Sequence, residues 1–168
     1  MPVTPYHFGP SGFVGLVFRK WLDIPVFVLA NVVVDIEVLL YRHWPAHRYA
    51  HTLLIGAAVG AIWGIVAYPL RNLFGKIMKI ICIPYETGFW KMVVSGILGV
   101  WLHVLIDAIY HRDVLIFWPS RVKPLFGLIS RGQVKLVCLG FFIAAAIAYA
   151  FTVAAYLKKN RIKRTDIT

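Results

Sequence analysis

Four apolar runs, each close to the length of a membrane-spanning helix, constrain this chain more than any other feature. They cover about residues 24–41, 52–70, 90–110 and 137–157. A helix needs about 20 mainly apolar residues to cross the hydrocarbon core of a bilayer, and inside that core only helices and closed barrels satisfy the backbone. The runs therefore predict an all-α fold, a polytopic membrane helical bundle with four long spans.

The composition supports one integral membrane domain over residues 1–168. Of the 168 residues, 60% are hydrophobic and only 15% are charged, which is too apolar for an ordinary soluble domain. The formal net charge of +11 is typical of Lys and Arg at the ends of spans, where they meet anionic head groups. We therefore expect the membrane lipid bilayer as a partner and no specific nucleic acid, and the oligomeric state stays open.

Shorter segments complete the expected architecture. A short N-terminal half-helix is expected at about residues 11–20, because the apolar stretch there is too short for a span. A basic tail is expected at 158–168. Segment 71–89 is basic and mixed, and segment 113–135 is interrupted by prolines, so both are expected as connections between spans.

The basic residues are divided unevenly between the two ends of the expected bundle. Eleven Lys and Arg side chains, five of them near the C-terminus, fall on one side and seven on the other. The positive-inside rule then predicts a cytoplasmic C-terminus and an extracytoplasmic opposite end. The expected location is the plasma (inner) membrane of a prokaryote.

A histidine and a carboxylate lie inside the third expected span. His103 and Asp107 are four residues apart, and a helix brings such residues to the same face. Ionisable side chains cost about 2.5 to 3.5 kcal/mol each at the centre of an inserted helix, so the pair needs a stabilising partner. A metal ion is the leading candidate, because imidazole and carboxylate are both good ligands. A hydrogen-bonded pair without metal is the alternative.

Further acids and histidines fall at the same end of the expected bundle. Asp35 and Glu37 lie near the end of the first span, and His47 and His51 lie in the connection to the second. Asp35 and Glu37 are two residues apart, roughly 200° around a helix, so both cannot face one centre without local unwinding. We favour Asp35 as a metal ligand and interpret Glu37 as a base or as an acceptor that supports a ligand.

The connection before the second span offers a pair of imidazoles with a cation between them. His47 and His51 would share a helical face if the second helix starts by Ala46. Arg48 is either a charge at the helix end or a phosphate clamp, since guanidinium matches phosphate with two parallel hydrogen bonds.

Four other polar residues are less constrained by spacing. His43 is expected as a solvated interfacial residue, and Asp113 as a cap or surface charge. His111 is either a ligand or part of a solvated loop. The side of the membrane on which His7 lies depends on the direction of the half-helix.

Several short motifs occur in a fixed order along most of the chain. They are Thr4-Pro5-Tyr6-His7, Val34-Asp35-Ile36-Glu37, His47-Arg48-Tyr49-Ala50-His51-Thr52, Gly99-Val100-Trp101-Leu102-His103-Val104-Leu105-Ile106-Asp107 and Ile116-Phe117-Trp118-Pro119. Together they resemble the YdjM-like family of membrane-bound, metal-dependent hydrolases, some described as LexA-regulated. That family is itself distantly similar to zinc-dependent phospholipase C.

The resemblance implies a metal-dependent hydrolase that cleaves a phosphoester of a lipid or lipid-linked substrate at the bilayer surface. The implied cofactor is a divalent metal, zinc, with one or two ions, because the chain lacks a further His-x-x-x-Glu motif. The implied metal ligands are His7, Asp35, His51, His103 and Asp107, and the implied catalytic residues are Glu37, Arg48 and His47.

Two other function classes fit the same polar cluster. A metal-ion or proton transporter would bind a passing ion with intramembrane His and Asp, near mid-membrane and with access from both faces. A non-catalytic structural protein would use the cluster only to hold helices together. Metal flux in vesicles would favour the first, and loss of stability without any change in metal content would favour the second.

Overall fold

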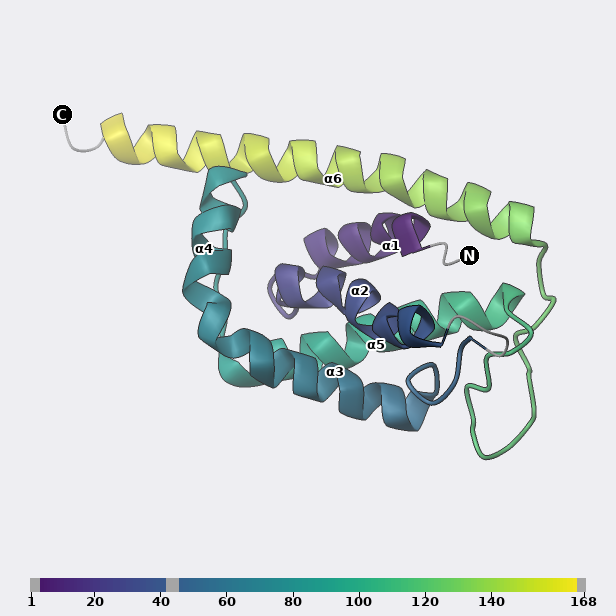
Figure 1. The fold of residues 1–168 in the computed structure, drawn as a ribbon. Helices are drawn as coiled ribbons and strands as arrows, with labels where there is room; N and C mark the ends of the chain where they lie inside the picture. Colours follow the sequence, from purple (N-terminus) through teal and green to yellow (C-terminus); the bar gives the residue numbers. More distant parts are fainter. Residues whose placement is uncertain (1–3, 42–45, 166–168) are drawn as a thin grey trace.

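The structure, a computed structural model, describes residues 4–41 and 46–165, so His43 lies outside the described residues. The described chain folds into helices, which confirms the predicted all-α class (Figure 1). They are α1 (Thr4–Val17), α2 (Ile24–Leu40), α3 (Leu53–Ala67), the short 3-10 helix η1 (Tyr68–Leu70), α4 (Arg71–Ile80), α5 (Phe89–Tyr110) and α6 (Arg131–Thr165).

Helix α5 is the centre of the bundle. It packs against α3 and against α2, while α1 packs between α2 and α6. Figure 1 shows α6 along the outer side of the molecule, with α1 beneath it. The metal-binding candidates on α5 are therefore enclosed by neighbours on several sides.

Glycines allow the helices of this bundle to approach closely. A Cβ atom added to Gly60 of α3 would lie 2.5 Å from the carbonyl oxygen of Gly96 of α5. A Cβ on Gly9 of α1 would lie 2.5 Å from the carbonyl oxygen of Cys138 of α6. Small residues at such crossings let backbones pack directly, which is the usual means of helix association in lipid.

Among the described residues, three helical segments are long and apolar enough to cross a membrane: Leu53–Ile80, Phe89–Tyr110 and Arg131–Ile162. The second agrees with the expected span at 90–110, and the third extends beyond the expected 137–157 at both ends. The expected span at 24–41 corresponds to α2, which has 17 residues and is not among these three.

Helices form in two places where the sequence predicted something else. Helix α1 begins at Thr4 instead of about residue 11, although it contains Pro10. Its packing on α6 and α2 outweighs the low helix propensity of its Gly and Pro residues. Helix α4 occupies part of the expected connection at 71–89, because Phe74 and Met78 are buried on one side of it while Lys76 and Lys79 stay exposed.

A single buried carboxylate fixes the turn between α1 and α2. Asp23 caps α2 by accepting from the backbone N–H of Val26 (3.1 Å), and it also accepts from the hydroxyls of Tyr85 (2.7 Å) and Thr87. Its own N–H donates to Ser95 Oγ of α5 (2.7 Å). Burial and the neighbouring Asp23 carboxylate raise the pKa of Tyr85, which stays a hydroxyl donor. The turn between α1 and α2 is thereby positioned against α5.

Candidate metal centre

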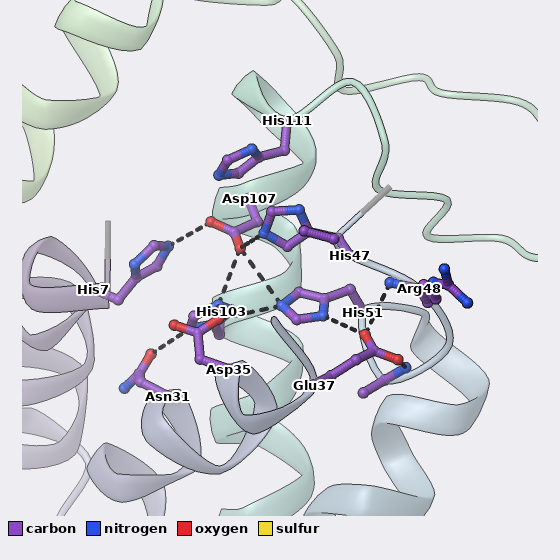
Figure 2. Close-up of polar contacts among 12 residues, drawn as sticks. His7, Asn31, Asp35, Glu37, His47, Arg48, His51, His103, Asp107 and His111 are labelled. Atoms are coloured by element: carbon purple, nitrogen blue, oxygen red, sulfur yellow. Dashed lines mark hydrogen bonds and ion pairs between the residues drawn. The ribbon is translucent and has the colours of Figure 1, made fainter. Parts of the chain in front are cut away.

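Four buried side chains meet where α2 and α5 approach the segment before α3 (Figure 2). Asp35 comes from α2, His103 and Asp107 come from α5, and His51 comes from the segment at 46–52. Each offers one ligand atom, and these atoms all lie within 4.8 Å of one another. No residue of the four is more than 6% exposed. The group could hold a metal ion.

The neighbours of His103 decide which of its ring nitrogens carries the proton. Asn31 Nδ2 donates to Ser11 Oγ (2.9 Å) and to the Val28 carbonyl (2.7 Å), so Asn31 Oδ1 faces His103 Nδ1 at 3.3 Å as an acceptor. This network assigns the proton to Nδ1 of His103. The lone pair of Nε2 then points into the group of four.

The lone pair of His103 Nε2 faces two carboxylates. It lies 3.2 Å from Asp35 Oδ1 and 3.1 Å from Asp107 Oδ2. A neutral imidazole nitrogen and two carboxylate oxygens repel one another at these distances unless a cation or a proton lies between them. The arrangement therefore favours a bound positive charge.

His51 has the same orientation as His103. Its Nδ1 donates to Glu37 Oε2 at 2.9 Å, and its Nε2 lies 3.4 Å from Asp35 Oδ1. That Nε2 is buried, and no described residue is its hydrogen-bond partner. Burial alone would lower the pKa of His51, but the Asp35 and Glu37 carboxylates raise it overall. Two imidazoles thus direct Nε2 at the same pair of acids.

Glu37 supports the segment that carries His51. Its carboxylate accepts from the backbone N–H groups of Arg48 (2.9 Å) and Ala50 (2.9 Å) as well as from His51 Nδ1. All three donors belong to the segment between α2 and α3. Of the two roles expected for Glu37, this geometry favours the acceptor that orients a ligand.

Asp107 is the shared residue of the site. Its Oδ1 lies 3.0 Å from His7 Nε2 and accepts from the Tyr110 hydroxyl at 2.8 Å. Helix α1 brings His7 to this end of the bundle, where its ring stacks on that of His103 at 4.2 Å between centroids. The direction of α1, which the sequence left open, therefore places His7 beside the four-residue group.

A second group adjoins the first through Asp107. His47, Asp107 and His111 also offer ligand atoms within 4.8 Å of one another. His47 Nδ1 donates to Asp113 Oδ2 at 3.0 Å, which turns His47 Nε2 towards Asp107 Oδ2 at 3.6 Å. Burial lowers the pKa of His111 to about 4, so its ring is neutral at pH 7. Its Nε2 is buried and has no hydrogen-bond partner within residues 4–41 and 46–165.

Asp113 holds the segment that carries His47. Its Oδ2 accepts from the backbone N–H groups of Ala46 (3.0 Å) and His47 (3.1 Å) in addition to the imidazole. Burial opposes ionisation of Asp113, but these donors hold the pKa of its carboxyl well below its usual range. The expectation of a cap or surface charge understated this role.

A shared helical face for His47 and His51 required a helix that starts by Ala46, and this condition is not met. Thr52 caps α3 by accepting from the Ile55 N–H, and α3 begins at Leu53, so both histidines lie in the preceding segment. Their rings still meet edge to face at 4.6 Å between centroids. Convergence here comes from contacts to Glu37 and Asp113, not from helical spacing.

Arg48 lies at the edge of the site. Its guanidinium is 4.2 Å from the centre of the Tyr41 ring, and the side chain is exposed. Together with His47 it borders a cavity of about 650 Å³. This position is compatible with the phosphate clamp considered from the sequence.

Sequence reasoning did not identify Asn31 and Tyr110 as residues that support the site. It also missed the hydrogen bonds by which Asp113 holds the segment that carries His47. Asn31 is fully buried and Tyr110 lies one turn after Asp107 on the same helix. An amide side chain within an apolar run was the only signal in the sequence that could have identified Asn31.

Comparison with known proteins adds no family to this description. No family model, no curated protein and no solved structure matches the chain. The geometry of the site is therefore the structural basis for its function.

Proposed function

We propose that this chain is a membrane-bound, metal-dependent hydrolase that cleaves a phosphoester of a lipid or lipid-linked substrate at the bilayer surface. One observation carries the proposal. His51 and His103 each have an acceptor facing Nδ1, and each turns Nε2 towards Asp35 and Asp107. Two imidazole nitrogens and two carboxylates gathered in a buried site, with the imidazoles oriented from behind, are an arrangement that suits a metal ion.

The proposed ion is zinc, held by Asp35, His51, His103 and Asp107. Imidazole nitrogen and carboxylate oxygen are common zinc ligands, and zinc accepts a fifth ligand during catalysis. When bound, the ion would supply Lewis acidity and lower the pKa of a coordinated water towards about 7. His7 borders the group through Asp107 and is the proposed additional ligand.

Arg48 and His47, from the segment between α2 and α3, and Glu37 of α2 have proposed roles in the reaction, and Asp113 supports His47. Arg48 neutralises charge on the phosphoryl group, because it borders the cavity beside His47. His47 takes the proton of the attacking water, and Asp113 orients it from behind. Glu37 is a positioning residue, since its oxygens already accept three N–H groups.

The number of ions decides the role of His47. With one ion, His47 is free to act as the base. With a second ion at His47, Asp107 and His111, it becomes a ligand, and Asp107 is shared between the two sites. Metal analysis of a His111→Ala variant separates these cases: the content is unchanged with one ion and falls by one equivalent with two.

The proposed topology adds α2 to the three long apolar segments as a fourth membrane span. Helix α2 lies between α1, α3 and α5, and its first residues are capped within the bundle by Asp23. The basic residues of α4 and of the C-terminal part of α6 favour a cytoplasmic C-terminus in a prokaryotic plasma membrane, with the metal centre extracytoplasmic. The position of the site towards one end of α5 favours chemistry at a surface over transport.

The resemblance to the YdjM-like family supports the same proposal. The residues that carry the resemblance, among them Asp35, His51, His103 and Asp107, are the residues of the buried group. The motifs are defined by order along the chain, and the group is defined by position in space.

The proposal is tested with purified protein in detergent. We expect a stoichiometric divalent metal and release of product from a lipid phosphoester that stops on chelation and returns with the metal. His103→Ala should lose both metal and activity, while Thr152→Val, a buried change on α6 away from the site, should keep both. Metal-free wild-type protein that is insensitive to chelators would refute the proposal.

A further inference from the structure

An open cavity of about 650 Å³ lies beside the metal centre, just beyond the end of α5. His47 forms part of its wall, and Nε2 of the same side chain lies 3.6 Å from Asp107 Oδ2. One imidazole therefore lies between the cavity and the four-residue group. A ligand that occupies the cavity is adjacent to the site of chemistry.

The lining of this cavity is cationic. Arg48, Arg112 and Lys123 contribute three positive charges, and Asp113 is the one acid among the described residues that line it. Lys123 Nζ donates to the carbonyl oxygen of Arg112, which fixes the ammonium group at the wall. The lining therefore has a net charge of +2 when His47 is neutral.

The carboxylate of Asp113 does not neutralise these cations. Its Oδ2 accepts three hydrogen bonds from the segment that carries His47. Among the described residues, neither Arg112 nor Lys123 forms an ion pair with a carboxylate. Two cations at the wall are thus available to an anionic ligand.

Aromatic side chains place the cavity at the boundary between lipid and water. Tyr49 and Trp118 line it and meet edge to face at 5.3 Å between centroids. They are 52% and 39% exposed, and Tyr and Trp are enriched at membrane interfaces. The cavity is therefore suited to the polar end of a molecule whose other end lies in the bilayer.

We infer that this cavity binds a terminal phosphate group carrying two negative charges, as in a phosphomonoester or a diphosphate, and discriminates against zwitterionic head groups. A terminal phosphate has a charge of about −1.5 to −2 at pH 7 and three acceptor oxygens, which match the two free cations and Arg48. A choline or ethanolamine group would instead bring a fourth cation to a wall of net positive charge.

This inference rests on the proposed hydrolase function only for the cleavage step. In that step the oxygen of water forms a bond to phosphorus, and the bond from phosphorus to the alkyl oxygen breaks. One proton leaves the water and one is taken up by the departing oxygen. A phosphomonoester lipid gives an alcohol and inorganic phosphate.

The test measures binding separately from turnover. Short-chain phosphatidic acid, phosphatidylcholine with the same acyl chains, and glycerol 3-phosphate are titrated into chelator-treated protein by calorimetry. We expect phosphatidic acid to bind about a hundredfold more tightly than phosphatidylcholine, since two hydrogen bonds to charged groups are gained. Comparable binding of glycerol 3-phosphate would identify a soluble source of the same phosphate, and weaker binding would identify a lipid source.

Matched variants connect the preference to the wall. Arg112→Gln and Lys123→Gln should each weaken phosphatidic acid binding about tenfold, the loss expected for one charged hydrogen bond. Arg121→Gln removes the same charge from an exposed position of the same loop that does not line the cavity, and it should keep the wild-type affinity. Equal affinity for the two lipids, or equal loss in all three variants, overturns the inference.

The outcome also distinguishes this inference from the proposed function. Metal-loaded protein that prefers phosphatidic acid but releases no phosphate would retain the cavity assignment and contradict hydrolysis of this class. Release of choline phosphate from phosphatidylcholine, without any preference for phosphatidic acid, would retain hydrolysis and contradict the cavity assignment.

Discussion

The orientation of His103 depends on a single buried amide, and this gives the sharpest prediction. In Asn31→Leu the side chain keeps a similar size, but the acceptor for His103 Nδ1–H is lost. The buried donor is then unsatisfied, which favours the other tautomer, in which Nε2 carries the proton and donates to Asp107 Oδ2 at 3.1 Å. That tautomer cannot bind a metal through Nε2.

The magnitude follows from the effect of such supporting side chains on metal affinity. Loss of a partner that orients a metal ligand weakens binding by about 10- to 100-fold. At a free metal concentration of about 100 times the wild-type Kd, metal stabilises the folded protein by about 2.7 kcal/mol. In Asn31→Leu the same concentration should contribute about 1.4 kcal/mol for a tenfold loss and about 0.4 kcal/mol for a hundredfold loss.

The assay is thermal unfolding in detergent with and without metal, combined with competition against a chelating dye. The difference between the two unfolding curves cancels the loss of the Asn31 contacts to Ser11 and Val28, which affects both states of metal loading. Ser95→Ala is the control. Like Asn31→Leu it removes a fully buried hydrogen-bonding side chain, but Ser95 lies on α5 and outside the site. Wild-type metal affinity in Asn31→Leu would contradict the tautomer assignment.

Three further predictions concern other parts of the molecule. Glu37→Gln should raise the metal Kd about tenfold and change the turnover of metal-saturated protein much less. A lower turnover rate at unchanged Kd, with an altered pH profile, would identify Glu37 as the base instead. Gly96→Ala should lower stability by about 1 to 3 kcal/mol, because its Cβ would meet the backbone of Gly60. Gly140→Ala should leave stability unchanged, because no described atom lies within 4 Å of the added Cβ. Thermal unfolding measures both. Burial and Asp23 raise the pKa of Tyr85, so its neutral form is favoured in the folded state. The contribution of this group to the free energy of unfolding is fully present below about pH 10, the pKa of an unperturbed Tyr, and is lost as the pH rises above it. Unfolding measured from pH 8 to 11 should show a steeper decline for the wild type than for Tyr85→Phe, and parallel curves would contradict this.

The part of the site that the sequence could predict depends on local spacing. His103 and Asp107 are one helical turn apart, and this relation holds in any helix. The presence of Asp35 and His51 at the same end follows from alternating directions of successive helices. These are properties of chain order, so no knowledge of side-chain contacts was needed.

The remainder depends on contacts between distant segments. Asn31 acts on His103 only because α2 packs against α5 in one register, and Asp113 acts on His47 across 66 positions of sequence. No periodicity in the sequence encodes such pairs. Helix α4 is different, because its buried Phe74 and Met78 are four residues apart and were a readable helical signal.

Helix α6 is longer than the hydrocarbon core of a bilayer is thick, so a helix that crosses this core extends beyond it. Its 35 residues extend about 52 Å at 1.5 Å per residue, against about 30 Å of hydrocarbon. It starts beside the metal centre, where the Arg131 guanidinium lies 5.8 Å from the Tyr110 ring centre. In the topology proposed above, the last turns extend beyond the hydrocarbon on the side away from the metal centre, so an antibody or dye attached there can be used for capture while the end that carries the metal centre stays unobstructed.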